Sequence, residues 1–350
     1  MNNVKVGLIG LGFMGSTHWR IYQELPGVEV VALADVDEAK RRGDVSKVVG
    51  NIGGGDNSVP LDMSGVAVYD DALKMIAEAD VDMVDICVPT PKHTEYILAA
   101  LKAGKHVFSE KPLCRTYEEI AIIRDAVKAS GKFFNVGMCV RAWPEYASAK
   151  EILDSGKLGK VKTALFRRLS PSVDGNAWKN WFMCDEMSGG AALDLHTHDT
   201  DVVCHFFGNP EAVSSNGVRG VVSDNGIDHI ITSYQYADGK FITAEGGWCA
   251  PGNVPFEMSF QIICEKGALK LDAAGFHLYW NCGKVETPDT GDASLPTGWH
   301  RELKYFTDCV RDNVTPDHYQ TPESVFASLA VVMAEIDSVD SKKVVEVKYV

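Results

Sequence analysis

The stretch Val4-Lys5-Val6-Gly7-Leu8-Ile9-Gly10-Leu11-Gly12-Phe13-Met14-Gly15 decides the fold class. Its first six residues form a short, mostly apolar run that predicts a buried parallel strand, and the spacing of Phe13–Glu24 predicts a helix directly after it. An acidic residue, Asp35, follows 20 positions beyond Gly15, at the end of a second apolar run, Val28–Ala34. A strand, a Gly-x-Gly-x-x-Gly turn, a helix and then an acid are typical of a dinucleotide-binding fold.

Each glycine of this pattern has a predicted role in holding a dinucleotide. Gly10 permits the tight turn after the strand, Gly12 lets the pyrophosphate approach the backbone, and Gly15 lets helix and strand pack closely. The helix begins at Phe13 and Met14, where unpaired N–H groups and the positive end of the helix dipole face the phosphates.

Asp35 indicates which coenzyme is bound. Its carboxylate can accept hydrogen bonds from both hydroxyls of the adenosine ribose, and its charge would repel a 2′-phosphate. No Arg or Lys follows Asp35 before Lys40. The sequence therefore favours NAD over NADP as the cofactor.

Strand and helix patterns alternate over residues 1–138, which predicts an α/β Rossmann domain with a doubly wound parallel sheet. A Gly-rich stretch, Gly50–Asn57, is interpreted as a loop and as a lid over cofactor or substrate. The other expected elements are the helices Asp37–Val49, Asp70–Ala79, Thr94–Ala103 and Thr116–Ala129 and the strands Val66–Tyr69, Val81–Val88, Lys105–Phe108 and Phe133–Val136.

The pattern changes over residues 139–350. After one helix, Pro144–Ser155, alternating runs and hairpin turns predict an α+β domain whose mainly antiparallel sheet has one face on helices. Helices at Glu302–Asn313 and Pro322–Ser338, together about 302–338, are expected near its end and can pack back on the first domain. The expected strands are Val161–Leu169, Ala212–Val218, His229–Tyr236, Lys240–Trp248, Glu257–Cys264, Ala268–Leu271, His277–Trp280 and Val344–Tyr349.

Composition limits the classes of function. The chain has 350 residues, with 34 Lys and Arg against 48 Asp and Glu, and a formal net charge of −14. Such a chain has no general attraction to nucleic acid or to an anionic membrane. Nine cysteines without a Cys-x-x-Cys pair indicate reduced thiols. Because there is neither a secretory leader nor an apolar run of about 18 residues, we expect a cytoplasmic protein.

The segment Ser109-Glu110-Lys111-Pro112 follows the fifth strand of the first domain. Ligands of such sheets bind at the carboxyl ends of the strands, near the point where the strand order switches. Lys111 is therefore expected at the nicotinamide end of the crevice. Pro112 holds Lys111 out of the helical region. An isolated Glu-Lys-Pro would be a solvated turn, so its position is what favours a functional role.

Acids and histidines are concentrated in the segment Gly189–Asp201. On a helix, Asp194 and His198 would share a face, so that Asp194 can orient the imidazole and raise its basicity, as a general base requires. Other interpretations stay open: Asp194 caps a helix and His198 is a core histidine, or Asp199 and Asp201 are solvated or pair with arginines. His196, His198 and an aspartate are a further alternative as zinc ligands, although no motif spacing such as His-Glu-x-x-His is present and we expect no metal.

With these segments the chain resembles the glucose–fructose oxidoreductase/inositol dehydrogenase family. The likeness is carried by Gly10–Gly15 with Asp35, by Cys87-Val88-Pro89-Thr90-Pro91-Lys92-His93, by Gly104–Pro112 and by Gly190–Asp201. Two departures are His196, which stands where many members have glycine, and the Gly50–Asn57 insertion. The first leaves open whether His196 faces the site or the sheet.

The resemblance implies a fold, a site and a substrate class. The second domain would be an open-faced sheet that carries the substrate site and the contact of a homo-oligomer, a dimer or tetramer. Catalysis would fall to Lys111, Asp194 and His198, on a sugar, cyclitol or related polyol. The residues implied along the cofactor, beyond the glycine-rich turn and Asp35, are Pro89, Thr90, His93, Glu110 and Lys111.

The hypothesis is an NAD(P)-dependent dehydrogenase acting on CH–OH groups. His198, oriented by Asp194, takes the proton of a secondary hydroxyl while hydride leaves the same carbon, and Lys111 stabilises the developing alkoxide. Substrate contacts are expected from Arg141, Arg168, Trp178 and His198. The alternatives are an NAD enzyme with net non-redox chemistry on a glycoside or sugar, a non-catalytic NAD-sensing regulator, and a metal-dependent hydrolase.

Overall fold

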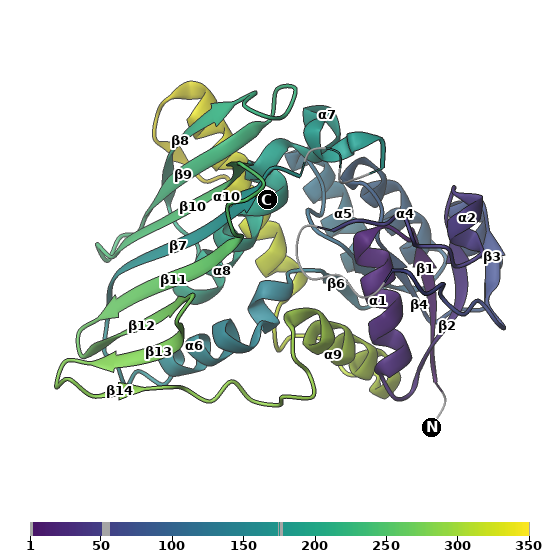
Figure 1. Ribbon diagram of the computed structural model, residues 1–350, viewed down its shortest axis with the longest axis horizontal. Helices are drawn as coiled ribbons and strands as arrows, with labels where there is room; N and C mark the ends of the chain where they lie inside the picture. The colour runs from purple at the N-terminus through teal and green to yellow at the C-terminus, as the bar shows by residue number, and fades with distance from the viewer. Residues whose placement is uncertain (1–2, 51–56, 174, 176–177, 350) are drawn as a thin grey trace. The chain divides into compact units, whose positions relative to one another are not determined.

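The computed structural model describes residues 3–50, 57–173, 175 and 178–349. Its chain forms two compact units (Figure 1). The first comprises Met1–Met138, Gly175–Trp181 and Trp299–Glu323. The second comprises Cys139–Asp174, Phe182–Gly298 and Ser324–Val350. None of the described helices has the length and apolar character needed to cross a membrane.

The first unit contains the six-stranded sheet that the alternation predicts. All of its neighbouring strands pair in parallel, which requires a crossover after each strand. The spatial order reverses between β1 and β4, and this reversal is the switch point of a doubly wound fold. In that order the strands are β3 (Ala67–Tyr69), β2 (Val28–Ala34), β1 (Val4–Ile9), β4 (Met83–Ile86), β5 (His106–Ser109) and β6 (Phe134–Val136).

Helices cover both faces of this sheet. Val6 and Leu8 of β1 lie in one core cluster with side chains of α1 and α9, whereas Gly7 points the other way, where an added Cβ would lie 3.1 Å from Met75 of α3. This alternation follows from the two-residue period of a strand. The helices of the unit are α1 (Phe13–Glu24), α2 (Glu38–Arg41), α3 (Ala72–Glu78), α4 (His93–Lys102), α5 (Tyr117–Ser130) and α9 (Gly298–Asp312, from Trp299 on).

The second unit contains a nine-stranded sheet in which only β7 and β10 pair in parallel. The α+β prediction with a mainly antiparallel sheet is therefore confirmed. In spatial order the strands are β14 (Val285–Glu286), β13 (Gly275–Trp280), β12 (Gly267–Asp272), β11 (Glu257–Cys264), β7 (Val161–Pro171), β10 (Phe241–Ala250), β9 (Ile227–Gln235), β8 (Ala212–Arg219) and β15 (Val345–Glu346).

One face of the nine-stranded sheet packs on helices and the other is open (Figure 1). Ala164, Phe166 and Arg168 alternate along β7 as buried residues, while Leu165 and Arg167 between them are exposed or half-buried. The helices of the unit are α6 (Pro144–Asp154), α7 (Asp185–Ser188), α8 (Thr197–Phe207) and most of α10 (Pro322–Ser341).

One predicted helix is wrong, and one predicted loop lies mostly outside the residues that the structure describes. The expected helix Asp37–Val49 is only the single turn Glu38–Arg41, because Gly43 adopts a φ of +86° and its carbonyl accepts the N–H of Leu61. Residues 51–56 of the predicted Gly50–Asn57 lid lie outside the described residues. The short strand β14 and the helix α7 were not predicted.

Candidate functional site

The predicted nucleotide-site residues of the first unit follow neighbouring strands at one edge of the sheet. Asp35 follows β2, the Gly10–Gly15 turn follows β1, Thr90 lies beyond β4, and Lys111 lies beyond β5. Since the sheet order is β2-β1-β4-β5, these groups succeed one another along the carboxyl edge. This edge, at the switch point, is where open α/β sheets bind ligands.

The three glycines have the surroundings that a dinucleotide turn requires. Gly10 has a φ of +89°, and a Cβ there would lie 2.5 Å from the carbonyl oxygen of Cys87. A Cβ on Gly15 would lie 1.9 Å from the oxygen of Gly10, so helix and strand are in direct contact. At Gly12 an added Cβ would meet nothing within 4 Å. The open side of Gly12 at the start of α1 therefore fits a bound pyrophosphate.

Asp35 is held in place by backbone N–H groups. Its carboxylate accepts from Leu11 N at 2.7 Å and from Asp37 N at 2.8 Å, which ties the end of β2 to the glycine-rich turn. Each carboxylate oxygen keeps further acceptor capacity for a ribose hydroxyl. Arg41 donates to the carbonyl oxygen of Asp35 at 2.7 Å.

The segment after β4 carries two predicted cofactor residues, Thr90 and His93, whose hydrogen bonding differs. Thr90 is buried, and its hydroxyl has no hydrogen-bond partner among the described residues, as expected of a group that a cofactor completes. His93 is also buried, with Nε2 2.8 Å from the oxygen of Val88 and Nδ1 3.0 Å from that of Pro112. Burial lowers the pKa of His93. Its two backbone contacts account for His93 without a cofactor, so its cofactor role stays a prediction, as does that of Pro89.

Glu110 and Lys111 form a connected turn after β5. The backbone N–H of Lys111 donates to Oε2 of Glu110 at 3.0 Å, and the Lys111–Pro112 peptide is cis. Glu110 is 5% exposed, whereas Lys111 is half-buried. The carboxylate of Glu110 is thus an internal support for the backbone of the predicted catalytic lysine.

Asp194 and His198 lie on one continuous helical segment of the second unit. A π-helical turn, Ala192–His196, leads directly into α8, so Asp194 belongs to the π turn and His198 to the α-helix. Single π turns occur often at functional sites. Asp194 caps neither helical stretch, which removes the capping interpretation. The predicted shared face assumed continuous α-helical spacing and stays a prediction.

His196 faces the sheet. Its ring packs on β10, where a Cβ added to Gly246 would lie 2.6 Å from its Nδ1, and its Nε2 lies 3.7 Å from Oε1 of Glu335. His196 and Glu335 are both fully buried. The open question of its orientation is therefore answered.

The two arginines that we expected at the substrate are bound inside the second unit. Arg141 donates to Asp201 through Nε and Nη2, at 2.7 and 2.6 Å, and Arg168 donates to Asp199 at 2.8 and 3.3 Å. Both guanidiniums are buried. Of the interpretations left open for Asp199 and Asp201, the structure shows the pairing with arginines. A substrate contact for either arginine stays a prediction without support from this geometry. The side chain of Trp178 lies outside the described residues.

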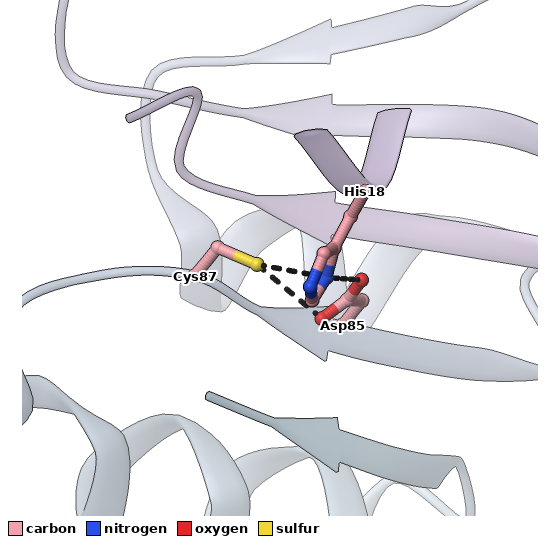
Figure 2. Close-up of side chains that lie close together, drawn as sticks. All are labelled: His18, Asp85 and Cys87. Carbon is pink, nitrogen blue, oxygen red and sulfur yellow. Dashed lines mark hydrogen bonds and ion pairs between the residues drawn. The ribbon is translucent and has the colours of Figure 1, made fainter. Parts of the chain in front are cut away.

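His18 was not singled out from the sequence. It lies on α1, fully buried, and its ring points at Asp85 of β4 and at Cys87 (Figure 2). Nδ1 is 2.8 Å from Oδ2 of Asp85, and Nε2 is 3.2 Å from Oε1 of Glu110. The available signal was Asp85 itself, an acid within an apolar run that predicts a buried strand.

Among the described residues, one group of three side chains has the mutual distances of a metal site: His18, Asp85 and Cys87. The alternative zinc set built on His196 and His198 is not such a group. All nine cysteines are free thiols.

A pocket in the first unit lies away from these residues. Asn3, Asp82, Lys105 and Arg311 are among its lining residues, at the amino ends of β1, β4 and β5. Ligands of doubly wound sheets bind at the other edge, so we do not assign the functional site to this pocket.

The fold and the glycine-rich turn at the carboxyl edge define a dinucleotide-binding domain of the Rossmann type. Residues 4–138 match the model of an oxidoreductase family with an NAD-binding Rossmann fold, and residues 146–270 match the GFO/IDH/MocA C-terminal domain. The chain belongs to this Gfo/Idh/MocA family, and its cofactor is NAD. The predicted resemblance and cofactor are therefore confirmed.

The chain is similar to several named proteins in sequence or in structure. Over 61% of this chain and 54% of the relative, the chain is 32% identical to levoglucosan dehydrogenase of Pseudarthrobacter phenanthrenivorans. It is 27% identical to inositol 2-dehydrogenase 3 of Saccharopolyspora erythraea over 98% of this chain and 95% of the relative. The structure of scyllo-inositol dehydrogenase from Lactobacillus casei with NAD(H) and scyllo-inositol superimposes with a TM-score of 0.78 at 24% identity, covering 99% of each chain.

Proposed function

We propose that this protein is an NAD-dependent dehydrogenase that oxidises a secondary alcohol of a cyclitol, sugar or related polyol, or reduces the corresponding ketone. The observation that carries the proposal is the order of groups along the carboxyl edge, from Asp35 through the glycine-rich turn to Lys111. The names of the relatives, inositol and levoglucosan dehydrogenases, support this substrate class.

The first unit would hold the coenzyme through groups already in place. Gly12 and the start of α1 receive the pyrophosphate, Asp35 the adenosine ribose, and Thr90 supplies a hydroxyl near the other end. When bound, NAD accepts a hydride from the carbon that carries the alcohol.

Three side chains carry the proton and the charge in this proposal. His198 removes the hydroxyl proton, Asp194 orients its imidazole, and Lys111 stabilises the oxygen on which negative charge develops. Arg141, Arg168 and Trp178 remain candidates for substrate contacts, although the two arginines have carboxylate partners of their own.

The test is NADH formation, followed by absorbance, over a panel of inositols, sugars, anhydrosugars and glycosides. We expect His198→Ala to lower kcat about 10²- to 10⁴-fold, the usual effect of removing a general base, with little change in NADH affinity. His318→Gln is the matched control, because His318 is an exposed histidine that takes no part in the proposed mechanism. A fully active His198→Ala variant would contradict the assignment.

The same panel separates the alternatives. An enzyme with net non-redox chemistry would convert a glycoside without accumulating NADH in proportion to product. A regulator would bind NADH and convert nothing. A double-mutant cycle of Lys111→Ala and His198→Ala then shows whether both groups act in one step, since coupled residues give non-additive losses.

We also infer that the open face of the nine-stranded sheet forms the contact of a homo-oligomer. The strand register places five partly exposed apolar side chains on this face: Leu165, Ile231, Phe241, Ile263 and Tyr279. Apolar surface of this kind marks protein contacts. Light scattering should show a dimer or tetramer, and Leu165→Glu with Ile231→Lys should reduce its mass. A monomeric wild-type chain would contradict the inference.

A further inference from the structure

His18 lies between two buried carboxylates. One ring nitrogen is 2.8 Å from Asp85, which is 0% exposed, and the other is 3.2 Å from Glu110, which is 5% exposed. The first contact is a hydrogen bond, whereas the second is an ion pair whose N–H is not aligned on the oxygen. Only an imidazolium carries a proton on both nitrogens, so the charged ring alone can serve both acids.

The surroundings favour this charged form. Burial lowers the pKa of His18, whereas Asp85 raises it through its charge and through the hydrogen bond to Nδ1. Burial also raises the pKa of Cys87 beyond any physiological pH, so the sulfur is a neutral thiol that donates to Oδ1 of Asp85 at 3.4 Å. The anionic partners of His18 are therefore the two carboxylates.

Tyr22 and Phe108 also pack against the ring of His18, and neither side chain is a cation. Tyr22 of α1 donates its hydroxyl to Oδ2 of Asp85 at 2.8 Å. Glu302 of α9 is a further buried acid on the side of Tyr22. Without the charge of His18, the carboxylates of Asp85 and Glu110 would lose the buried cation that lies between them, which costs several kcal/mol per group.

Hydrogen bonds explain the cluster better than a metal ion. Nδ1 of His18 and Oδ2 of Asp85 are 2.8 Å apart. Two ligands of a tetrahedral zinc with bonds of 2.0–2.2 Å would lie roughly 3.3 Å apart. The second nitrogen of His18 faces Glu110, which the metal set does not include.

Glu110 connects this cluster to Lys111. Its Oε1 faces His18 on one side and the backbone of Gly137 on the other, where an added Cβ would lie 2.8 Å away. Its Oε2 accepts the backbone N–H of Lys111 at 3.0 Å. The Glu110 carboxylate is thus confined between the ring of His18 and Gly137. Its second oxygen, Oε2, fixes the backbone N–H of Lys111.

We propose that His18 is a buried imidazolium that positions Lys111 through Glu110. It is a positioning residue, since it contacts neither substrate nor cofactor in this scheme. The expected effect of His18 on turnover rests on the proposed dehydrogenase function. The charge of His18 and its effect on the Lys111 backbone are independent of that function.

The charge is tested by NMR of the wild-type protein with labelled histidine. Both ring nitrogens of His18 should keep their protons between about pH 6 and pH 9, a range in which an ordinary histidine loses one of them. In Glu110→Gln the ring should lose a proton at lower pH than in the wild type. A singly protonated ring at pH 7, or stoichiometric zinc in the purified protein, would overturn the proposal.

The positioning role is tested with His18→Gln, and Tyr22→Phe is the control, because it removes one donor to Asp85 and leaves Glu110 untouched. Hydrogen exchange of the Lys111 amide should accelerate about tenfold in His18→Gln and stay unchanged in Tyr22→Phe, as expected if one hydrogen bond of about 1.4 kcal/mol is lost. This readout needs no substrate. Equal exchange in His18→Gln and wild type would overturn the proposal even if the protein oxidises no polyol.

Kinetics separate positioning from general loss of structure. In His18→Gln, kcat should fall about 10- to 100-fold, the effect of a small misplacement of a catalytic group, while the NADH dissociation constant changes less than about threefold. Glu110→Gln should show the same split, which keeps the test valid if His18→Gln folds poorly. Unchanged kcat in both variants would contradict the positioning role.

Discussion

Two glycines of the dinucleotide turn differ in what an added methyl group meets. At Gly12 it meets nothing within 4 Å, whereas at Gly15 it meets the oxygen of Gly10 at 1.9 Å. We therefore expect Gly12→Ala to leave the melting temperature unchanged and to weaken NADH binding about 5- to 150-fold, since overpacking a close contact costs about 1–3 kcal/mol. Fluorescence titration measures the affinity.

Gly15→Ala is the matched variant. Its methyl group would overlap backbone rather than a movable side chain, so we expect a loss of about 3 kcal/mol or more in the free energy of unfolding. Denaturant unfolding measures it. If Gly12→Ala destabilises the free protein as much as Gly15→Ala does, the roles assigned to the two glycines are wrong.

Single residues were predictable where their chemistry is local. Gly10, Gly12, Gly15 and Asp35 were assigned because one short turn imposes all four requirements. The partners of Arg141 and Arg168 lie 60 and 31 residues away, so no local pattern shows that the guanidiniums are occupied. His18 was missed for the same reason, because one histidine on a helix does not indicate that two carboxylates, 67 and 92 residues further along the chain, lie against its ring.

At the scale of one element, α8 is held to its domain by two buried ion pairs. Asp199 binds Arg168 of β7, and Asp201 binds Arg141. Removing one partner leaves an uncompensated buried charge, so Asp199→Asn should lower the free energy of unfolding by about 3–5 kcal/mol. Arg168→Met combined with Asp199→Leu should cost less. The surface pair of half-buried Lys150 and exposed Asp154 is the control, worth under about 1 kcal/mol. Equal losses for both pairs would contradict this account.

The last turn of α8 carries a histidine that stays neutral. Burial, assisted by Arg141, lowers the pKa of His205 to about 4. The unfolded chain takes up this proton near pH 6.5. The stabilisation is therefore fully present above about pH 6.5 and is lost as the pH falls toward 4. His205→Gln should flatten the dependence of the urea midpoint on pH in this window. An unchanged slope would show that the ring is not buried neutral.

Elements were predictable where hydrophobic periodicity is regular. The bounds of β1, α1, β2 and β11 coincide with their predictions. In each case a regular hydrophobic pattern ends at turn residues, so that the sequence marks both ends of the element. The predicted helix Asp37–Val49 failed because the contact of Gly43 with Leu61 is tertiary. The π turn at Ala192–His196 could not be foreseen, since its residues have ordinary helical spacing in the sequence.

At the scale of the whole molecule, the first unit depends on chain far beyond its first 138 residues. Leu303 and Phe306 of α9 are fully buried in its core cluster, which also contains Phe108. Losing two such side chains costs about 4–10 kcal/mol, comparable to the stability of a domain. A fragment ending at Met138 should therefore show no cooperative unfolding by circular dichroism. The same fragment joined to residues 299–323 by a flexible linker should unfold cooperatively and bind NADH. A stable, NADH-binding 1–138 fragment would contradict this dependence.

The π turn before α8 has a consequence for how this helix can diverge. Such a turn contains one residue more than the α-helical turn it replaces, so losing a single codon within Ala192–His196 would yield an unbroken α-helix. Everything before the deletion would rotate by about 100° relative to α8. Asp194 would then present a different side to its neighbours while His198 keeps its place. Insertions and deletions, which most buried helices do not tolerate, are thus a route by which the side chain presented at the position of Asp194 can be exchanged in evolution.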